Sequence, residues 1–259
     1  MYPELGFMNK NLVKILRNCL LMGGLIIPSR FIPGDDIFKG VRGPTNWQLD
    51  SRAMYSKNDA DVKSFKNALI LKYWDGDKSG KWGFIHVPYN FIDSPSGDAQ
   101  GFGDVSFGAG PRFSIDCFHL IPYMGLKLPT GDTSGKVTLG DGRYDIKSGL
   151  FATYLTKDKL FEIDGSLEYA VTGENKKGVN PADELAFGLL VGGKITETIR
   201  AGTGFTDLIK DGDYVLNARS VLRYTFSPRF HAELVGDVGI RSRDIPLGFN
   251  VGLFFRYNF

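Results

Sequence analysis

The stretch from residue 248 to residue 259 constrains the fold most, because it alternates strictly between two kinds of side chain. With a period of two, six large apolar side chains share one face of an extended strand: Phe249, Val251, Leu253, Phe255, Tyr257 and Phe259. A soluble protein rarely leaves such a strand uncovered, since its face and edge would recruit other chains. In a membrane barrel, the apolar face meets lipid and the edge pairs with another strand. This stretch therefore predicts a transmembrane β-barrel.

The rest of the chain repeats the pattern in about twelve segments, each close to the length of a tilted membrane strand. We expect strands near residues 46–56, 63–74, 80–91, 102–113, 117–128, 144–155, 159–171, 184–195, 198–207, 214–226, 229–240 and 247–259. Charge on the lipid side costs a few kcal/mol at mid-bilayer. The apolar face of each segment should therefore point outward and the charged face inward. The predicted fold class is all-β, a closed antiparallel transmembrane barrel.

The connections between these segments differ in length in the way expected of such a barrel. Outer-membrane barrels have short periplasmic turns and longer external loops. With both barrel ends in the periplasm, the turns after even-numbered strands should be short, as at residues 156–158 and 227–228. The longest connections, residues 129–143 and 172–183, follow odd-numbered strands. Two exceptions are the rather long turn at residues 75–79 and the brief loop around Asn58.

The composition excludes other classes of protein. No apolar run of about 20 residues, as a membrane helix needs, occurs outside the N-terminal segment. A formal net charge of +2 gives no field that would attract nucleic acid. Two cysteines are too few for a disulfide scaffold. A soluble β-sandwich or a lipocalin-like barrel remains as an alternative, with the apolar faces turned inward.

The N-terminal segment has the features of an export signal. Residues 1–29 contain the basic Lys10, Lys14 and Arg17, then a short apolar core at residues 19–27, which predicts a signal peptide. Met8 is an alternative start, because the preceding residues add nothing to this pattern. Residues 30–45 are rich in proline and glycine, so we expect an irregular segment in the periplasm or the lumen. The barrel would then occupy residues 46–259.

Two glycine-rich motifs resemble a known family. They are Gly101-Phe-Gly-Asp104-Val-Ser-Phe-Gly108-Ala-Gly110 and Gly125-Leu-Lys127-Leu-Pro-Thr-Gly-Asp132. In order and spacing they look like segments of the MetA-pathway-of-phenol-degradation family, a set of Gram-negative outer-membrane transporters. The resemblance extends over most of residues 46–259. It departs after Gly110, where the family often carries a basic residue and this chain has Pro111, with Arg112 next.

The residues of these motifs also have a purely structural interpretation. We expect Gly108 and Gly110 to face inward, where an aromatic ring can fold over the backbone. Asp104 should lie near the external rim, and Lys127 should point inward just before the chain turns into the longest loop. Barrel curvature and loop geometry account for such residues better than ligand binding does.

The sequence contains no convincing metal-binding or catalytic motif. His86, His119 and His231 lack metal-ligand spacing. A hydrolase triad could be assembled from Ser106, His231 and Asp104, but nothing in the sequence brings them together. We therefore expect neither an enzyme nor a metal or cofactor site.

The inward face suggests a mechanism. Acids and bases occur there in similar numbers on neighbouring strands, so opposite charges can pair and leave a narrow lumen. Aromatic side chains on the same face include Trp74, Phe151 and Phe254. The candidate solute path comprises Arg52, Lys72, Trp82, Phe84, His86, Asp104, Arg112, Lys127, Glu162, Asp164, Glu168, Arg200, Arg219, Arg223, His231, Glu233, Asp237 and Arg256.

The family resemblance implies passive uptake of small hydrophobic or aromatic solutes through this lumen, in the bacterial outer membrane. The alternative is a closed structural barrel that acts through its external loops, especially residues 131–142 and 172–182. The expected partners are outer-membrane lipids, a small solute and the barrel-assembly machinery, but no nucleic acid. Phe255, Tyr257 and Phe259 resemble the C-terminal signal that this machinery recognises.

Overall fold

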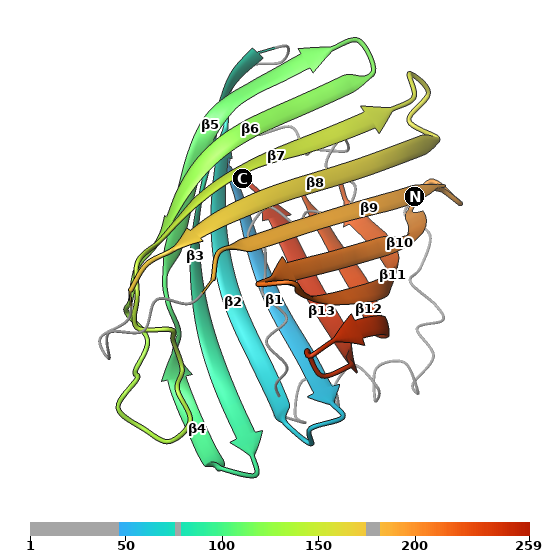
Figure 1. Ribbon diagram of the computed structural model, residues 1–259. Helices are drawn as coiled ribbons and strands as arrows, with labels where there is room; N and C mark the ends of the chain where they lie inside the picture. The colour runs from blue at the N-terminus through green and yellow to red at the C-terminus, as the bar shows by residue number, and fades with distance from the viewer. Residues whose placement is uncertain (1–46, 76–78, 175–181) are drawn as a thin grey trace.

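The computed structural model describes residues 47–75, 79–174 and 182–259, and they form thirteen β-strands (Figure 1). No helix in this part of the chain is long and apolar enough to cross a membrane. The predicted signal peptide and the segment 30–45 lie outside the described residues. The strands are β1 (Trp47–Asn58), β2 (Lys63–Trp74), β3 (Ser79–Ser94), β4 (Gly97–Phe102), β5 (Ser106–Ile115), β6 (Phe118–Lys127), β7 (Asp145–Leu155), β8 (Phe161–Thr172), β9 (Glu184–Lys194), β10 (Ile199–Lys210), β11 (Asp213–Ser227), β12 (Phe230–Arg243) and β13 (Gly248–Asn258).

The sheet closes into a barrel, because its strands from β1 to β3 and from β5 to β13 pair in a complete ring. Each strand from β5 to β13 is antiparallel to its sequence neighbour, and β1 pairs with both β13 and β2. β2 also pairs with β3, which completes the ring. β4 and β5 pair with different parts of the same edge of β3, so the two together take one position in the wall. The thirteen strands therefore form a twelve-stranded barrel. The closed antiparallel barrel predicted from the sequence is confirmed.

One segment differs from the prediction. The expected strand at residues 102–113 begins only at Ser106, as β5, because Phe102 ends a separate strand, β4, and residues 103–105 form a break between the two. The expected strand at residues 80–91 continues to Ser94 and forms a hairpin with β4. Gly97 has a φ of 128° in this hairpin, which an L side chain rarely adopts. The hairpin extends the barrel wall beyond the length that a membrane strand needs.

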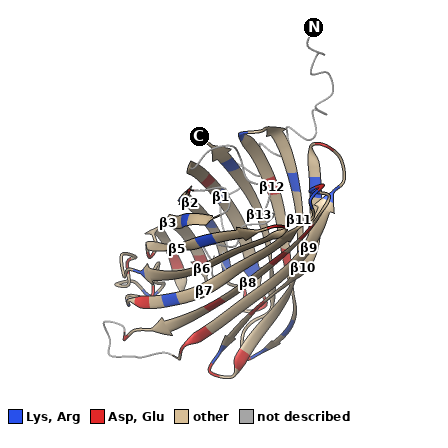
Figure 2. Ribbon diagram, turned by 90° about the horizontal axis from the view of Figure 1, so that it is seen from above, with Lys and Arg blue, Asp and Glu red and all other residues tan. Residues whose placement is uncertain are grey.

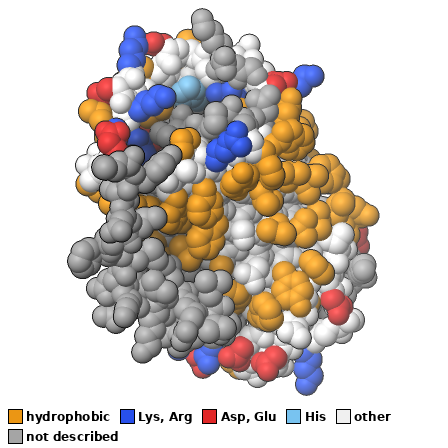
Figure 3. Space-filling view, turned by 180° about the vertical axis from the view of Figure 1, so that it is seen from behind, with side chains coloured by type: hydrophobic (Ala, Val, Ile, Leu, Met, Phe, Trp, Pro, Cys, Tyr) orange, Lys and Arg blue, Asp and Glu red, His pale blue; other side chains and the backbone are white. Residues whose placement is uncertain are grey.

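Side chains alternate between the two faces of the wall along each strand. In β13, Asn250, Phe254, Arg256 and Asn258 are buried, whereas the alternate positions are half-buried or exposed. Large apolar side chains cover the outer surface, as Figure 3 shows for one side of the barrel. Leu69 and Met124 are 54% and 66% exposed. Such a surface requires lipid around it, which excludes the soluble alternative.

The two ends of the barrel differ in their connections. The backbone N–H of Phe259 donates to the carbonyl of Trp47 (3.1 Å), so the start of β1 and the end of β13 lie together at one end of the barrel. The short turns at residues 116–117, 156–160, 195–198 and 228–229 lie at the same end, and the connections 128–144 and 173–183 lie at the other. Short turns mark the periplasmic end of an outer-membrane barrel. The opposite end, with the longest loops, is therefore the external end.

Candidate functional site in the barrel lumen

A buried carboxylate, Asp50, forms the centre of an ion-pair network on the inner wall. It accepts hydrogen bonds from Lys72 Nζ (2.7 Å), Arg52 (3.0 Å) and Arg256 Nε (3.1 Å). Asp50 and Arg256 are directly opposite in the pairing of β1 with β13, and Lys72 lies on β2. Period-two alternation turns all these side chains inward. Each of the four is 5% exposed or less, so one buried carboxylate lies among three buried cations.

The network continues around the wall through Glu233 on β12. Arg256 reaches Glu233 (3.2 Å), and Glu233 accepts a hydrogen bond from Arg223 Nε on β11 (2.6 Å). Glu233 and Arg223 are opposite in the strand register. An alternating chain of base and acid thus runs across β2, β1, β13, β12 and β11.

Further ion pairs follow the same rule. Arg219 Nε lies 2.7 Å from Asp237, Arg200 lies 3.1 Å from Glu162, and Lys147 lies 2.6 Å from Glu168. The partners are on adjacent strands or next-nearest strands. Figure 2 shows that acidic and basic positions are distributed over the strands around the barrel. These pairs lie along the wall, and so they do not bridge the lumen from one side to the other.

An aromatic cluster covers another part of the inner wall, on β3, β6 and β7. Trp82, Phe84, Tyr123 and Phe151 are all buried, and their rings contact one another. Tyr123 and Phe151 stack with ring centroids 4.8 Å apart, and Trp82 packs edge-on against both at 5.7 Å. The Tyr123 hydroxyl donates a hydrogen bond to Glu168, which connects the cluster to the ion pairs. The wall therefore offers an apolar strip beside a charged one.

Glycines allow these rings to lie against the backbone of the wall. A Cβ at Gly108 would lie 2.6 Å from a ring carbon of Phe84, and one at Gly149 would lie 2.4 Å from a ring carbon of Tyr123. Both glycines thus provide space that any larger residue would occupy. The ring expected over Gly108 is present. At Gly110 the neighbour is instead the Pro122 carbonyl, 1.9 Å from the position of a Cβ, so close backbone approach explains this glycine.

A smaller apolar cluster lies on the other side of the barrel. Phe254 on β13 packs with Met54, Leu190 and Val221 among others. The guanidinium of Arg52 lies over the Phe254 ring, 5.0 Å from its centroid. Arg52 thus interacts both with the Phe254 ring and with the Asp50 carboxylate.

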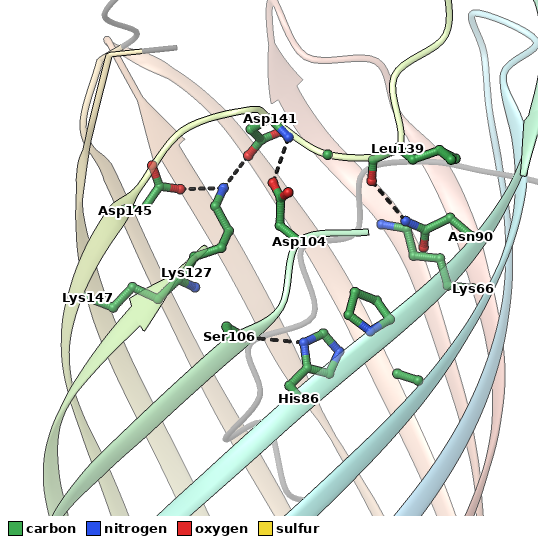
Figure 4. A pocket seen from close by; sticks show the side chains of 13 residues that line it. Lys66, His86, Asn90, Asp104, Ser106, Lys127, Leu139, Asp141, Asp145 and Lys147 are labelled. Atoms are coloured by element: carbon green, nitrogen blue, oxygen red, sulfur yellow. Dashed lines mark hydrogen bonds and ion pairs between the residues drawn. The ribbon is translucent and has the colours of Figure 1, made fainter. Parts of the chain in front are cut away.

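A cavity of about 200 Å³ opens at the external end of the lumen (Figure 4). Its apolar lining includes Pro88 and Leu139, and its polar lining includes Asn90 and His86, whose Nδ1 lies 3.3 Å from Ser106 Oγ. Charged residues complete the lining: Lys66 on β2, Lys127 on β6, Asp145 and Lys147 on β7, and Asp104 and Asp141 between strands. A small molecule with both an apolar and a polar part would find both kinds of contact here.

The structure places every residue of the predicted solute path on the inner wall or at its external rim. Lys127 and Arg219 are the most accessible, each with 13% of its side chain exposed. Buried residues are Arg52, Lys72, Trp82, Phe84, His86, Asp104, Arg112, Glu162, Asp164, Glu168, Arg200, Arg223, His231, Glu233, Asp237 and Arg256. Their proximity to a moving solute stays a prediction.

Sequence reasoning missed several inward residues. Tyr123 and Ile121 are buried in the aromatic cluster, and alternation counted back from Lys127 would have placed both. Arg143 and Glu184 are also buried, with nitrogen and oxygen 3.6 Å apart. They flank loops, where alternation gives little guidance. Asn90 lies within the strand predicted at residues 80–91, where alternation counted from His86 would have placed it inward.

The residues considered for a hydrolase do not form a catalytic arrangement in the described part of the chain. Ser106 is hydrogen-bonded to His86, and the Asp104 carboxylate accepts backbone N–H groups of a loop. His231 lies on β12, and its strand neighbour in the register is Arg256. Among these described residues there is also no cluster of ligands suited to a metal ion.

The fold is shared with known outer-membrane proteins. An outer membrane channel from Pseudomonas putida F1 matches with a TM-score of 0.70 and 16% identity, over 86% of this chain and 99% of that one. The β domain of the Bordetella autotransporter BrkA gives a TM-score of 0.56 at 12% identity, over 83% and 99%. The CymD monoaromatic hydrocarbon channel gives 0.52 at 7% identity, over 83% and 89%. At these identities the likeness concerns the fold.

A comparison with curated protein sequences finds no match. The family model described as "Putative MetA-pathway of phenol degradation" matches residues 67–256, which include both glycine-rich motifs and most of the barrel. The chain is thus a bacterial outer-membrane β-barrel that belongs to the MetA-pathway-of-phenol-degradation family.

Proposed function

We propose that this barrel is a passive outer-membrane channel for small hydrophobic or aromatic solutes. The observation that carries the proposal is the aromatic cluster on the inner wall, formed by Trp82, Phe84, Tyr123 and Phe151. Aromatic side chains in a transmembrane barrel are expected on the lipid side and in the interfacial girdles, whereas the interior is usually polar. An apolar strip inside the barrel gives an aromatic solute a surface that water does not compete for.

The ion pairs support the same function. A solute without charge gains nothing from a fixed field, and a lumen lined by unpaired charges of one sign would favour ions. Here Asp50, Glu233, Asp237, Glu162 and Glu168 each have a basic partner within 3.2 Å. The wall is therefore polar, and each of these acids is paired with a base.

The relatives point the same way. The family description names phenol degradation, and CymD is described as a channel for monoaromatic hydrocarbons. On this proposal a solute enters through the external cavity beside Pro88 and Leu139, passes the aromatic cluster and leaves at the periplasmic end. Movement follows the concentration gradient.

Planar lipid bilayers test the proposal. We expect the purified protein to give discrete current steps, and we expect nicotinamide, a small aromatic, to reduce the current more than a pentose at the same concentration. Phe84→Leu should weaken the effect of nicotinamide, because it removes an aromatic ring from the inner wall. Phe107→Leu is the matched control, since Phe107 lies on β5, which pairs with the strand of Phe84, but it faces lipid and is 42% exposed. Absence of current steps, or equal effects of both solutes, would contradict the proposal.

We further propose that the barrel-assembly machinery recognises the C-terminal aromatic residues after export by the N-terminal signal peptide. Tyr257 and Phe259 are 41% and 50% exposed at the periplasmic end of the outer face. Phe259→Asp should lower the amount of folded barrel in the outer membrane, measured as the species that migrates faster when unboiled. The molecules that do insert should transport normally. Wild-type yield of the folded variant would refute this role.

A further inference from the structure

The two glycine-rich motifs meet at the external end of the barrel. The Thr130 hydroxyl accepts a hydrogen bond from the N–H of Val105 (2.8 Å) and donates one to the carbonyl of Gly103 (3.1 Å). Thr130 belongs to the second motif, and the other two residues belong to the first. The break between β4 and β5 is therefore the place where the wall binds the loop of residues 128–144, here called the external loop.

Asp104, in that same break, binds both legs of the external loop, the first at Gly131 and the second at Asp141. One carboxylate oxygen accepts the N–H of Gly131 (2.9 Å), and the other accepts the N–H of Asp141 (2.7 Å). Asp104 is only 9% exposed. Hydrogen bonds to an ionised acceptor are about twice as strong as neutral ones, and two of them converge on one side chain. Residues ten positions apart in the sequence are thereby held together.

Two glycines allow this close approach. A Cβ at Gly140 would lie 2.2 Å from an oxygen of Asp104, and one at Gly131 would lie 2.8 Å from the Cα of Gly140. The two legs of the loop thus touch each other and the carboxylate. The N–H of Leu139 also donates to the carbonyl of Asp132 (2.8 Å), which closes the base of the loop.

Further contacts extend the second leg of the loop over the mouth. Asn90 Nδ2 on β3 donates to the carbonyl of Leu139 (3.2 Å). Lys127 forms ion pairs with both Asp141 and Asp145. Figure 4 shows the second leg, from Leu139 to Asp141, passing over the cavity, with Asp104 and Lys127 pointing towards it from below. Residues 139–141 form part of the cavity lining, so the loop narrows the entrance.

We propose that Asp104 is the positioning residue that holds the external loop across the mouth, and that this loop sets the upper size of the solutes that pass. The inference rests on the proposed channel function. It also explains why the two motifs occur together: one provides the carboxylate, and the other provides a loop base shaped to receive it. Solutes meet the loop itself, and Asp104 acts through the loop.

The expected effect follows from the lost hydrogen bonds. Removing two hydrogen bonds to a charged acceptor should raise the population of released loop by at least about tenfold. Asp104→Ala removes both acceptors. Asp104→Asn keeps one acceptor oxygen and turns an amide N–H towards the other donor, so its effect should be intermediate. Asp98→Asn is the matched control, since it removes one exposed acid from the neighbouring β4 hairpin at the same end of the barrel.

The test uses full-length protein in liposomes, with a pentose and a disaccharide as neutral probes of two sizes. We expect Asp104→Ala to increase disaccharide entry several-fold and to raise the ratio of disaccharide to pentose entry. Amide hydrogen exchange across residues 131–142 should be at least about tenfold faster in this variant, because exchange follows the open population. Gel mobility of the unboiled sample verifies that the barrel itself is intact.

Thr130→Val provides a second variant at the same joint. If both residues hold one loop, the effect of the double variant, expressed as a free energy, should be smaller than the sum of the two single effects. Faster exchange with an unchanged disaccharide-to-pentose ratio would overturn the inference, as would wild-type exchange in Asp104→Ala. Pentose entry through the wild-type barrel tests the channel function separately, so failure of the loop proposal and failure of the channel proposal can be distinguished.

Discussion

Replacement of Asp50 by asparagine should destabilise the barrel more than any change of an exposed acid. Asp50 is 1% exposed and has three basic partners, Lys72, Arg52 and Arg256, within 3.1 Å. The asparagine side chain has almost the same volume, so the change removes the negative charge and leaves the packing in place. The three cations then remain buried with one fewer counter-charge on their side of the network.

The expected loss is about 3–5 kcal/mol of unfolding free energy, the usual cost of removing one partner of a buried ion pair. Urea unfolding of the barrel in lipid vesicles, followed by tryptophan fluorescence and by gel mobility, measures this quantity. Asp98→Asn is the matched control, because an exposed acid contributes about 1 kcal/mol or less.

Adding Lys72→Met to Asp50→Asn removes one of the cations left without its carboxylate. The double variant should therefore be more stable than the sum of the two single effects predicts. A loss for Asp50→Asn no larger than that of Asp98→Asn would refute the reasoning, since it would mean that water or other groups already solvate the three cations.

Two further predictions concern single sites. Gly108→Ala should cost about 1–3 kcal/mol of unfolding free energy, because its Cβ would lie 2.6 Å from the Phe84 ring; Gly236→Ala, with no atom within 4 Å of the new Cβ, should cost less. The hydrogen bond from the Thr156 hydroxyl, aided by a backbone N–H, lowers the pKa of Asp158 below its usual value in the periplasmic turn. Thr156→Val should therefore raise the pKa of Asp158, which carboxyl ¹³C NMR in micelles measures; an unchanged titration midpoint would contradict this account.

The alternation of apolar and polar side chains alone predicts most of the barrel. Lipid outside and charge inside impose a strict period of two on every membrane-spanning strand. The terminal strand shows this best: Phe249 and Tyr257 face outward, and Arg256 faces inward beside Asp50. The prediction is wrong at the β4–β5 break. Residues 103–105 are not part of a strand, and the Asp104 carboxylate binds the backbone of the external loop there. The local alternation of side chains does not predict this break.

The site was predictable to the level of faces and charges. Acids and bases on neighbouring strands do pair, as Arg223 and Glu233 show. Their arrangement along the wall, rather than across the lumen, depends on strand stagger and side-chain length. The contact of the two motifs through Thr130 joins segments on opposite sides of a hairpin, and only the folded chain reveals it.

The most direct test of the channel function is solute entry into liposomes that contain the purified protein. We expect nicotinamide to enter these liposomes faster than protein-free liposomes, and its entry to exceed that of a pentose by more than the lipid path alone provides. Phe84→Leu should reduce this excess and Phe107→Leu should not. Nicotinamide entry equal to that of protein-free liposomes would contradict the channel function.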